Sequence, residues 1–359
     1  MISDVMQIQA ADATSSLTPC HRDELLRLWL KPLKLFRIAN NMRRMSCGDE
    51  VSFVINRNIN FTNRCIGSCK FCAFHQQAGY TLTREQILAR VADAEEREAT
   101  EICLQGGLAP EMALEDYCEI LETIRSSFPR MHLHAYSPME VLHMSKNSGM
   151  EIEDSLLELK RSGLGSMPGT AAEILVDHVR QKICPEKLSS EDWINIICKA
   201  HSIGIPTTST MLYGHVECLE DRLRHLQILR DLQAKTHGFT EFVLLPFIPG
   251  NNALGPLARR PDLLEHLKMH AFARIMLHPL ITNIQASWTK LGREAAAAAL
   301  NWGVNDLGGT LMEENISRSA GSKEAQYLSA EELIELIEAR GKRAVQRTTL
   351  YERVEAPLC

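Results

Sequence analysis

The sequence predicts an α/β protein, folded as a closed (β/α)8 barrel of TIM type with helical extensions at both ends. Short β-rich runs alternate with longer segments whose apolar residues recur at helical spacing, from residue 51 onward. Alternation of this kind favours parallel strands joined by helical crossovers. Eight such units fit a closed barrel better than an open sheet, and glycine and polar residues follow each run, where a barrel carries its chemistry.

An N-terminal extension covers residues 1–50. Within it, residues 22–47 carry leucines and Phe36 near helical spacing, and Pro32 interrupts the pattern. Because proline removes a helical hydrogen bond and clashes with the preceding turn, we expect two short helices here.

The barrel is expected over residues 51–320. Its eight predicted strands are Val51–Asn60, Glu101–Gly106, His132–Tyr136, Gly165–Met167, Pro206–Tyr213, Glu241–Phe247, Thr282–Trp288 and Asn305–Gly308. The helices between them are expected at Thr83–Arg97, Met112–Ser126, Glu151–Ser162, Ala171–Gln181, Glu191–Ile203, Leu219–Ala234 and Pro261–Leu277. A C-terminal extension over 321–359 adds an amphipathic helix at Ser329–Arg340 and a short strand at Gln346–Tyr351.

Composition narrows the class of protein. The net charge of -6 and the pI of about 6.1 provide no overall cationic field for nucleic acid. The first twenty residues lack the basic start and apolar stretch of a secretory signal, and no segment has 18 consecutive apolar residues. Eleven cysteines, an odd number, favour reduced thiols over a disulfide framework. We expect a cytoplasmic protein with neither nucleic acid nor membrane as a partner.

Three cysteines with C-x3-C-x2-C spacing, Cys65, Cys69 and Cys72, follow the first expected strand. Three thiolates can hold a 4Fe-4S cluster and leave one iron free to coordinate S-adenosylmethionine (SAM). A zinc site is the alternative, with His75 as the fourth ligand. A zinc knuckle is normally a small autonomous unit, whereas these cysteines follow a barrel strand, so the cluster is favoured.

The segment Cys-x3-Cys-x-Phe-Cys resembles the signature of the radical SAM superfamily. The resemblance implies one 4Fe-4S cluster, SAM as cofactor, and adenine near the backbone of Phe71. Gly106 and Gly107 resemble the superfamily's Gly-Gly-Glu segment, which receives the SAM amino group, but Leu108 replaces the carboxylate. The partner of that amino group is therefore open. A segment with Met211, Gly214 and Glu217 resembles the fifth-strand region that packs on adenine.

Longer stretches resemble one family, the 4-hydroxyphenyl transferase subunit of FO synthase (the CofH family). They include HAYSPMEV (134–141), GLGSMPGTAAEIL (163–175), IPTTSTMLYGHVE (205–217) and NDLGGTLMEENISRSAG (305–321). The resemblance implies that the enzyme cleaves the Cα–Cβ bond of L-tyrosine. It transfers the 4-hydroxybenzyl group to 5-amino-6-(D-ribitylamino)uracil, in biosynthesis of the deazaflavin FO. It also implies a low-potential electron donor of flavodoxin or ferredoxin type and a companion radical SAM subunit.

The catalytic residues stay open. Polar side chains expected near strand C-termini could serve the substrates, and each could equally be a barrel-rim hydrogen bond or a helix cap. The candidates are Tyr136, Ser137, Glu140, Thr170, His215, Asn305, Asp306 and Thr310. Rival functions are a menaquinone-pathway enzyme acting on futalosine derivatives, an iron-sulfur electron carrier and a zinc-binding module.

Overall fold

Parallel strands form a ring at the centre of the computed structural model, which describes residues 19–324 and 327–354. One sheet has the order β2-β3-β4 and the other has the order β5-β6-β7-β8-β1-β9. The strands are β1 Glu50–Val54, β2 Asn56–Ile59, β3 Glu101–Leu104, β4 His132–Ala135, β5 Thr207–Tyr213, β6 Phe239–Pro246, β7 Ile284–Ala286, β8 Asp306–Gly309 and β9 Arg343–Gln346.

The two sheets close into one barrel at two joints. At the first joint, β1 pairs with β8 and β2 pairs with β3, so a single strand bent at Ile55 belongs to both sheets. At the second, Ser166 bridges to His134 and Met167 bridges to Thr207. The expected strand Gly165–Met167 is thus reduced to two isolated bridges, yet it completes the ring. The predicted eight-stranded barrel is confirmed.

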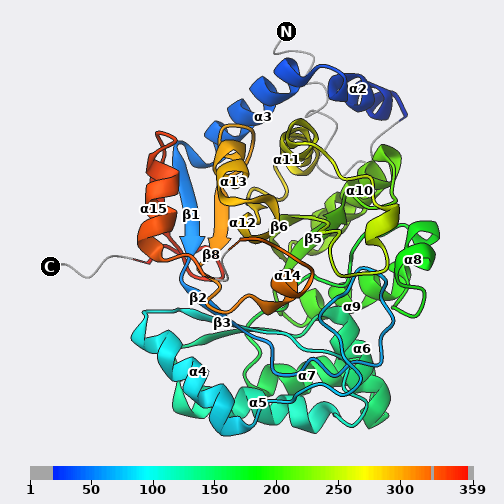
Figure 1. The fold of residues 1–359 in the computed structure, drawn as a ribbon, viewed down its shortest axis with the longest axis vertical. Helices are drawn as coiled ribbons and strands as arrows, with labels where there is room; N and C mark the ends of the chain where they lie inside the picture. Colours follow the sequence, from blue (N-terminus) through cyan, green and yellow to red (C-terminus); the bar gives the residue numbers. More distant parts are fainter. Residues whose placement is uncertain (1–18, 325–326, 355–359) are drawn as a thin grey trace, which may run out of the picture.

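Helices cover the outside of the ring (Figure 1). Those that follow the expected pattern are α4 Arg84–Glu96, α5 Leu114–Ser127, α7 Ile152–Ser162, α9 Ser190–Ser202, α10 Leu219–Thr236 and α11 Leu263–Leu277. Short helices complete the C-terminal half of the barrel, at η1 Gly255–Leu257, α12 Trp288–Leu291, α13 Arg293–Ala299 and α14 Asn315–Ser319.

Two helices differ from the prediction. The helix expected at Ala171–Gln181 begins only at α8, Asp177–Ile183, because Ala171 and Glu173 adopt positive φ angles of 61° and 45° that no helix accepts. An unexpected helix, α6 Pro138–Ser148, follows β4. A capping box starts it, since the Ser137 hydroxyl accepts from the Glu140 amide and the Glu140 carboxylate accepts from the Ser137 amide.

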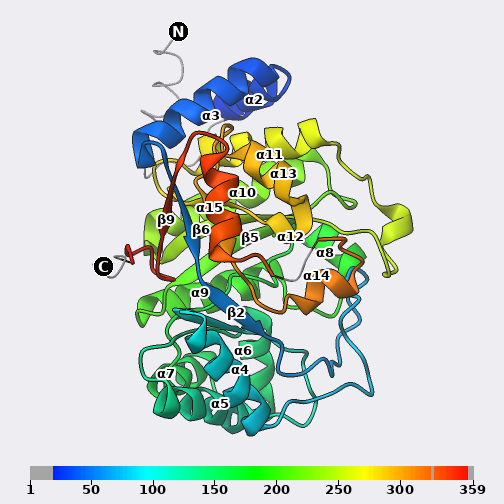
Figure 2. The same ribbon diagram turned by 60° about the vertical axis from the view of Figure 1, so that its left-hand side comes forward.

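Both extensions pack on the barrel. The two expected N-terminal helices are confirmed as α2 Pro19–Trp29 and α3 Pro32–Cys47, which lie beside α11 at one end of the molecule (Figure 2). The expected C-terminal helix is confirmed as α15 Ala330–Glu338. The strand expected at Gln346–Tyr351 was misplaced: β9 ends where that range begins, and it pairs in parallel with β1. Beyond it the chain turns so that the Arg347 side chain reaches Asp306 inside the barrel.

Inward-facing side chains form levels inside the barrel. Three strands, β3, β5 and β6, show the order from the amino-terminal end to the mouth: first Glu101, Thr208 and Glu241, then Cys103, Thr210 and Val243, and last Gln105, Leu212 and Leu245. None of the helices in the described ranges is both long and apolar enough to cross a membrane.

Candidate functional site

A cavity of about 510 Å³ occupies the barrel interior. It begins at the cysteine loop, between β2 and α4, and reaches down to the level of Glu101 and Glu241. The interior of a TIM barrel is usually filled by layers of branched side chains. Here Gly308 and Gly309 on β8 and Thr208 and Thr210 on β5 are among the residues that line an open space instead. The cavity is large enough for small-molecule substrates.

The cysteine loop is held against the end of β3 by close backbone contacts. The Gly107 amide donates to the Thr62 carbonyl at 2.8 Å, and the Ile66 amide donates to the Leu108 carbonyl at 3.0 Å. A Cβ atom at Gly107 would lie 2.2 Å from the carbonyl oxygen of Arg64, so only glycine allows this approach. The glycine pair therefore positions the loop.

The three thiols of this loop lie along one wall of the cavity. Cys65, Cys69 and Cys72 all line it and are half-buried. Gly67 lies between two of them, because a Cβ there would lie 3.3 Å from Cys65 Sγ and 4.0 Å from Cys69 Sγ. Burial raises the pKa of the Cys69 thiol to about 12, although the Lys187 ammonium partly opposes this. The loop thus leaves space beside its thiols that a side chain would fill.

The three thiols on this loop fit the protein ligands of a 4Fe-4S cluster. Among residues 19–324 and 327–354, no three His, Cys, Asp or Glu side chains converge closely enough to hold one metal ion. A structural zinc site needs about four ligands around one centre, and His75 lines the cavity without completing such a set. The cysteines of a 4Fe-4S cluster bind different iron atoms, so separated thiols are compatible with it.

Glu140 is the buried carboxylate nearest to the glycine pair. Its Oε1 accepts from the Gly106 amide at 3.0 Å, and its Oε2 accepts from the Ser137 amide and hydroxyl, each at 2.7 Å. Burial raises its pKa to about 6, although these hydrogen bonds act in the opposite direction. Glu140 and Ser137 both line the cavity. A carboxylate thus stands beside Gly106 although Leu108 supplies none.

An apolar wall flanks the cysteine loop. Phe71, Val216 and Phe247 pack against a small buried cluster of Ile183, Cys184 and Leu254. The Lys187 ammonium lies 5.3 Å from the centre of the Phe71 ring and 2.7 Å from Glu173 Oε1. A flat heterocycle would find both apolar contacts and a nearby cation here.

The segment after β5 holds its own turn together. Glu217 accepts from the Gly214 amide at 2.6 Å, from the His215 amide at 2.9 Å and from Arg222 Nε at 2.8 Å. Despite burial, these partners lower the Glu217 pKa to about 2. None of these residues lines the cavity, and Met211 lies in the apolar core, because Thr210 and Leu212 take the inward positions. Only the neighbouring Val216 reaches the apolar wall.

Two expected site residues lie at the wrong end of the barrel. Asn305 and Asp306 were expected at the mouth, but β8 begins at Asp306 and its carboxyl end is Gly309. The prediction treated the strand's start as its end. Asn305 Oδ1 accepts from Arg274 Nη2 at 2.6 Å and from the Ile284 amide at 2.9 Å, and Asp306 binds Arg347. Both side chains are engaged within the protein, at the end of β8 away from the mouth.

The remaining candidate site residues differ in whether they line the cavity. Thr170 lines the cavity. Tyr136 does not: it is buried, and its hydroxyl donates to the Tyr117 carbonyl at 2.8 Å. Thr310 joins β8 to β2, since its hydroxyl donates to the Asn56 carbonyl at 2.8 Å.

Several lining residues were not singled out from the sequence. They include two lysines at the mouth, Lys187 and Lys290, and a polar set deeper in the barrel, namely Glu101, His134, Glu241, Arg347 and Thr349. Charged residues at inward positions of barrel strands were the available signal for Glu101 and Glu241. The signal was missed because both were treated only as the first residues of expected strands.

Comparison with known proteins agrees with this geometry. The radical SAM superfamily model matches residues 59–229, and a CofH/MqnC C-terminal region model matches residues 236–358. A 5-amino-6-(D-ribitylamino)uracil–L-tyrosine 4-hydroxyphenyl transferase of Methanosarcina barkeri is 51% identical over 92% of this chain and 90% of its own. The transferase of Methanococcoides burtonii is 46% identical over 99% of this chain and its whole length. The chain belongs to this transferase family.

Solved structures support the fold of this family member. Methylornithine synthase (PylB) superposes with a TM-score of 0.73 at 17% identity, over 95% of this chain and 96% of its own. The FeFe-hydrogenase maturase HydG from Carboxydothermus hydrogenoformans gives 0.72 at 17% identity, over 98% of this chain and 81% of its own. Membership of the radical SAM superfamily implies a 4Fe-4S cluster and SAM.

Proposed function

We propose that this protein cleaves the Cα–Cβ bond of L-tyrosine and transfers the 4-hydroxybenzyl group to C5 of 5-amino-6-(D-ribitylamino)uracil, leaving 2-iminoacetate. The observation that carries the proposal is the cysteine loop opening into a deep barrel cavity, in a chain about half identical to transferases of that name. Cys65, Cys69 and Cys72 would hold the 4Fe-4S cluster, and the cluster with SAM would supply the radical chemistry that the cleavage of tyrosine needs.

The residues of the chain then have positioning roles. The apolar wall with Phe71 receives the adenine of SAM. Lys290, half-buried at the mouth, offers a cation for the tyrosine carboxylate. The barrel encloses both substrates, which matters because a benzylic radical must meet its acceptor before it reacts elsewhere.

Two partners belong to the same proposal. A low-potential donor of flavodoxin or ferredoxin type reduces the cluster, and a companion radical SAM subunit closes the ring to FO.

The organic substrate separates the proposed function from the menaquinone-pathway function, because both functions use the cluster and SAM. Reconstituted enzyme should convert L-tyrosine and the ribityl pyrimidine together under reducing, anaerobic conditions. Consumption of a futalosine derivative in place of tyrosine would show the menaquinone-pathway function.

Glu140 takes the place of the missing carboxylate at Leu108 in this proposal and receives the SAM amino group. Changing Glu140→Gln should weaken SAM binding about 10- to 100-fold, the usual value of a hydrogen bond to a charged group. Equilibrium dialysis with labelled SAM measures this, and iron content checks that the cluster stays loaded. Glu115→Gln, exposed at the start of α5, is the matched control and should bind SAM normally.

The same assignment predicts a pH dependence. Because burial raises the Glu140 pKa to about 6, the carboxyl group is largely protonated at pH 5 and ionised at pH 7. SAM affinity should therefore increase as the pH rises through this range, and the Gln variant should lose the increase. An unchanged pH profile in the variant would place the SAM amino group elsewhere.

A further inference from the structure

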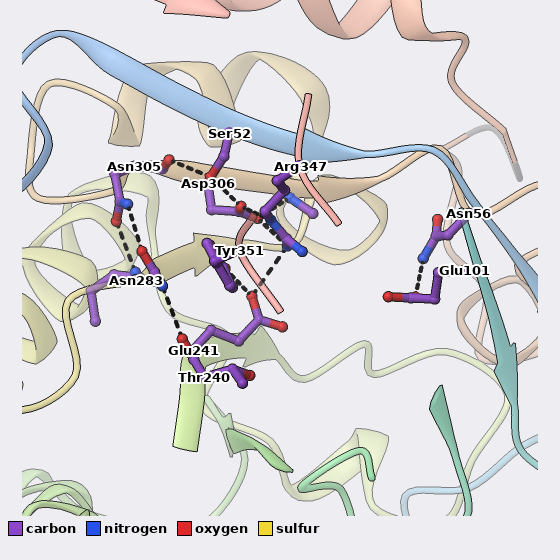
Figure 3. A network of polar contacts seen from close by, with 12 residues as sticks. Ser52, Asn56, Glu101, Thr240, Glu241, Asn283, Asn305, Asp306, Arg347 and Tyr351 are labelled. Atoms are coloured by element: carbon purple, nitrogen blue, oxygen red, sulfur yellow. Dashed lines mark hydrogen bonds and ion pairs between the residues drawn. The ribbon is translucent and has the colours of Figure 1, made fainter. Parts of the chain in front are cut away.

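The inner end of the cavity has a polar floor. We use this term for Glu101, His134, Glu241, Arg347 and Thr349, which all line the cavity and are all at least nine-tenths buried. The first three come from barrel strands, and the last two come from the C-terminal extension after β9. Figure 3 shows Glu101 and Glu241 on opposite sides of the space that Arg347 enters.

The charge of Arg347 is already neutralised within the protein. Its Nε donates to Asp306 Oδ2 at 2.6 Å and its Nη2 donates to Asp306 Oδ1 at 3.1 Å, which forms a bidentate pair. Ser52 and the Gly308 amide also donate to Asp306, which does not line the cavity. Glu101, whose pKa is lowered, therefore gives the floor free hydrogen-bond acceptors, whereas burial raises the pKa of Glu241 to about 7, so Glu241 can both accept and donate.

These acceptors retain unused capacity. A carboxylate has about four acceptor sites. Glu101 Oε1 accepts from Asn56 Nδ2 at 2.8 Å, and Glu241 accepts from the Tyr351 hydroxyl and weakly from Arg347 at 3.4 Å. The Thr349 hydroxyl lies beside Glu101 and helps to lower the pKa of that carboxyl group. Among the described residues its oxygen accepts no hydrogen bond, so it keeps acceptor capacity for a ligand.

We infer that this floor binds the ribityl chain of the pyrimidine substrate. The inference rests on the proposed function. Tyrosine must contact the SAM-derived radical at the mouth, and the pyrimidine must contact tyrosine, so the part of the pyrimidine that does not react is free to lie deepest. Gly106 lies five positions after Glu101 along β3 and the segment that follows it, about 16 Å of extended chain, which is long enough for this order of reactants.

The hydrogen-bonding groups of the ribityl chain match those of the polar floor. Each ribityl hydroxyl donates one hydrogen bond and accepts others. The glutamates can accept from these hydroxyls, and the Thr349 hydroxyl can accept from one of them. Neither the tyrosine phenol, with one hydroxyl, nor its ring provides as many donors for this surface.

The test is a comparison of two pyrimidines on the cluster-loaded enzyme with SAM. Calorimetry measures the Kd of 5-amino-6-(D-ribitylamino)uracil, of 5,6-diaminouracil, which lacks the chain, and of L-tyrosine. Glu101→Gln and Thr349→Val should each weaken binding of the ribityl compound about 10-fold, in line with the loss of a hydrogen bond in a buried site. Binding of 5,6-diaminouracil and of tyrosine should change less than about 2-fold. Ser52→Ala, which contacts Asp306 without lining the cavity, is the matched control.

The outcomes separate this inference from the proposed function. Equal weakening of both pyrimidines in the variants, or weakening of tyrosine alone, would overturn the floor assignment while the wild-type enzyme still converts its substrates. If the wild-type enzyme binds neither pyrimidine, the proposed function fails as well. Thr349→Val keeps the side-chain shape, so it remains informative if the Glu101 variant does not fold.

Discussion

Enzyme in which Cys65, Cys69 or Cys72 is changed to Ala is expected to lose both the iron-sulfur absorbance and the cleavage of SAM. Three thiolates are the protein ligands of a cluster that keeps one iron open, so none of them can be spared. The measurement is iron content and visible absorbance after anaerobic reconstitution, followed by assay of 5′-deoxyadenosine. The expected loss of activity is complete.

Three other cysteines provide controls for cluster loading, two of them away from the cavity and one in its lining. Cys118 and Cys198 lie on α5 and α9, so their Ala variants should load the cluster normally. Cys184 is the sharper control, because it lines the same cavity and lies in the apolar cluster that Cys69 contacts. Loss of the cluster in Cys184→Ala would indicate a fourth protein ligand, as in an electron carrier. Full activity in any variant of the first three cysteines would contradict the assignment.

Replacing Arg347 with Met is expected to lower the free energy of unfolding by about 3–5 kcal/mol. The substitution leaves Asp306 buried and without its bidentate partner, and leaves Glu241 beside it. Urea unfolding followed by circular dichroism measures the loss. The large effect comes from the uncompensated buried charge rather than from the worth of the ion pair itself.

Arg343→Met is the matched control. Arg343 lies four residues earlier in the same extension and pairs with Glu50, but its side chain is 63% exposed. Exposed ion pairs contribute about 0–1 kcal/mol. If the two variants lost stability equally, the buried Arg347–Asp306 pair would not be what holds the C-terminal extension on the barrel.

The sequence predicted the barrel because apolar periodicity survives in every long element. It failed where few residues or tertiary contacts decide the structure. Gly165–Met167 is too short to pair as a strand beyond two bridges, and the first strand divides at Ile55 because its two halves pair with different neighbours. The positive φ angles of Ala171 and Glu173 have no signature in the helical pattern of that segment.

The site was predictable to the extent that it is local. The cysteine spacing and the glycine pair are short motifs, and the structure brings both to one wall of the cavity. A helix cap was one of the two structural alternatives predicted for Ser137 and Glu140, and the capping box confirms it, but no helix was predicted to follow. The glutamates of the polar floor carried a signal that was missed, but its Arg347 and Thr349 could not be predicted, because they reach the cavity only when β9 pairs with β1.

The fate of the tyrosine carbons tests the central claim most directly. Tyrosine labelled with carbon-13 at Cα or at Cβ is incubated anaerobically with the reduced, cluster-loaded enzyme, SAM and the ribityl pyrimidine, and the products are resolved by mass spectrometry. The account predicts that the Cβ label enters the pyrimidine adduct and that the Cα label leaves in 2-iminoacetate. Cα label in the adduct, or tyrosine that stays intact while 5′-deoxyadenosine accumulates, would contradict it.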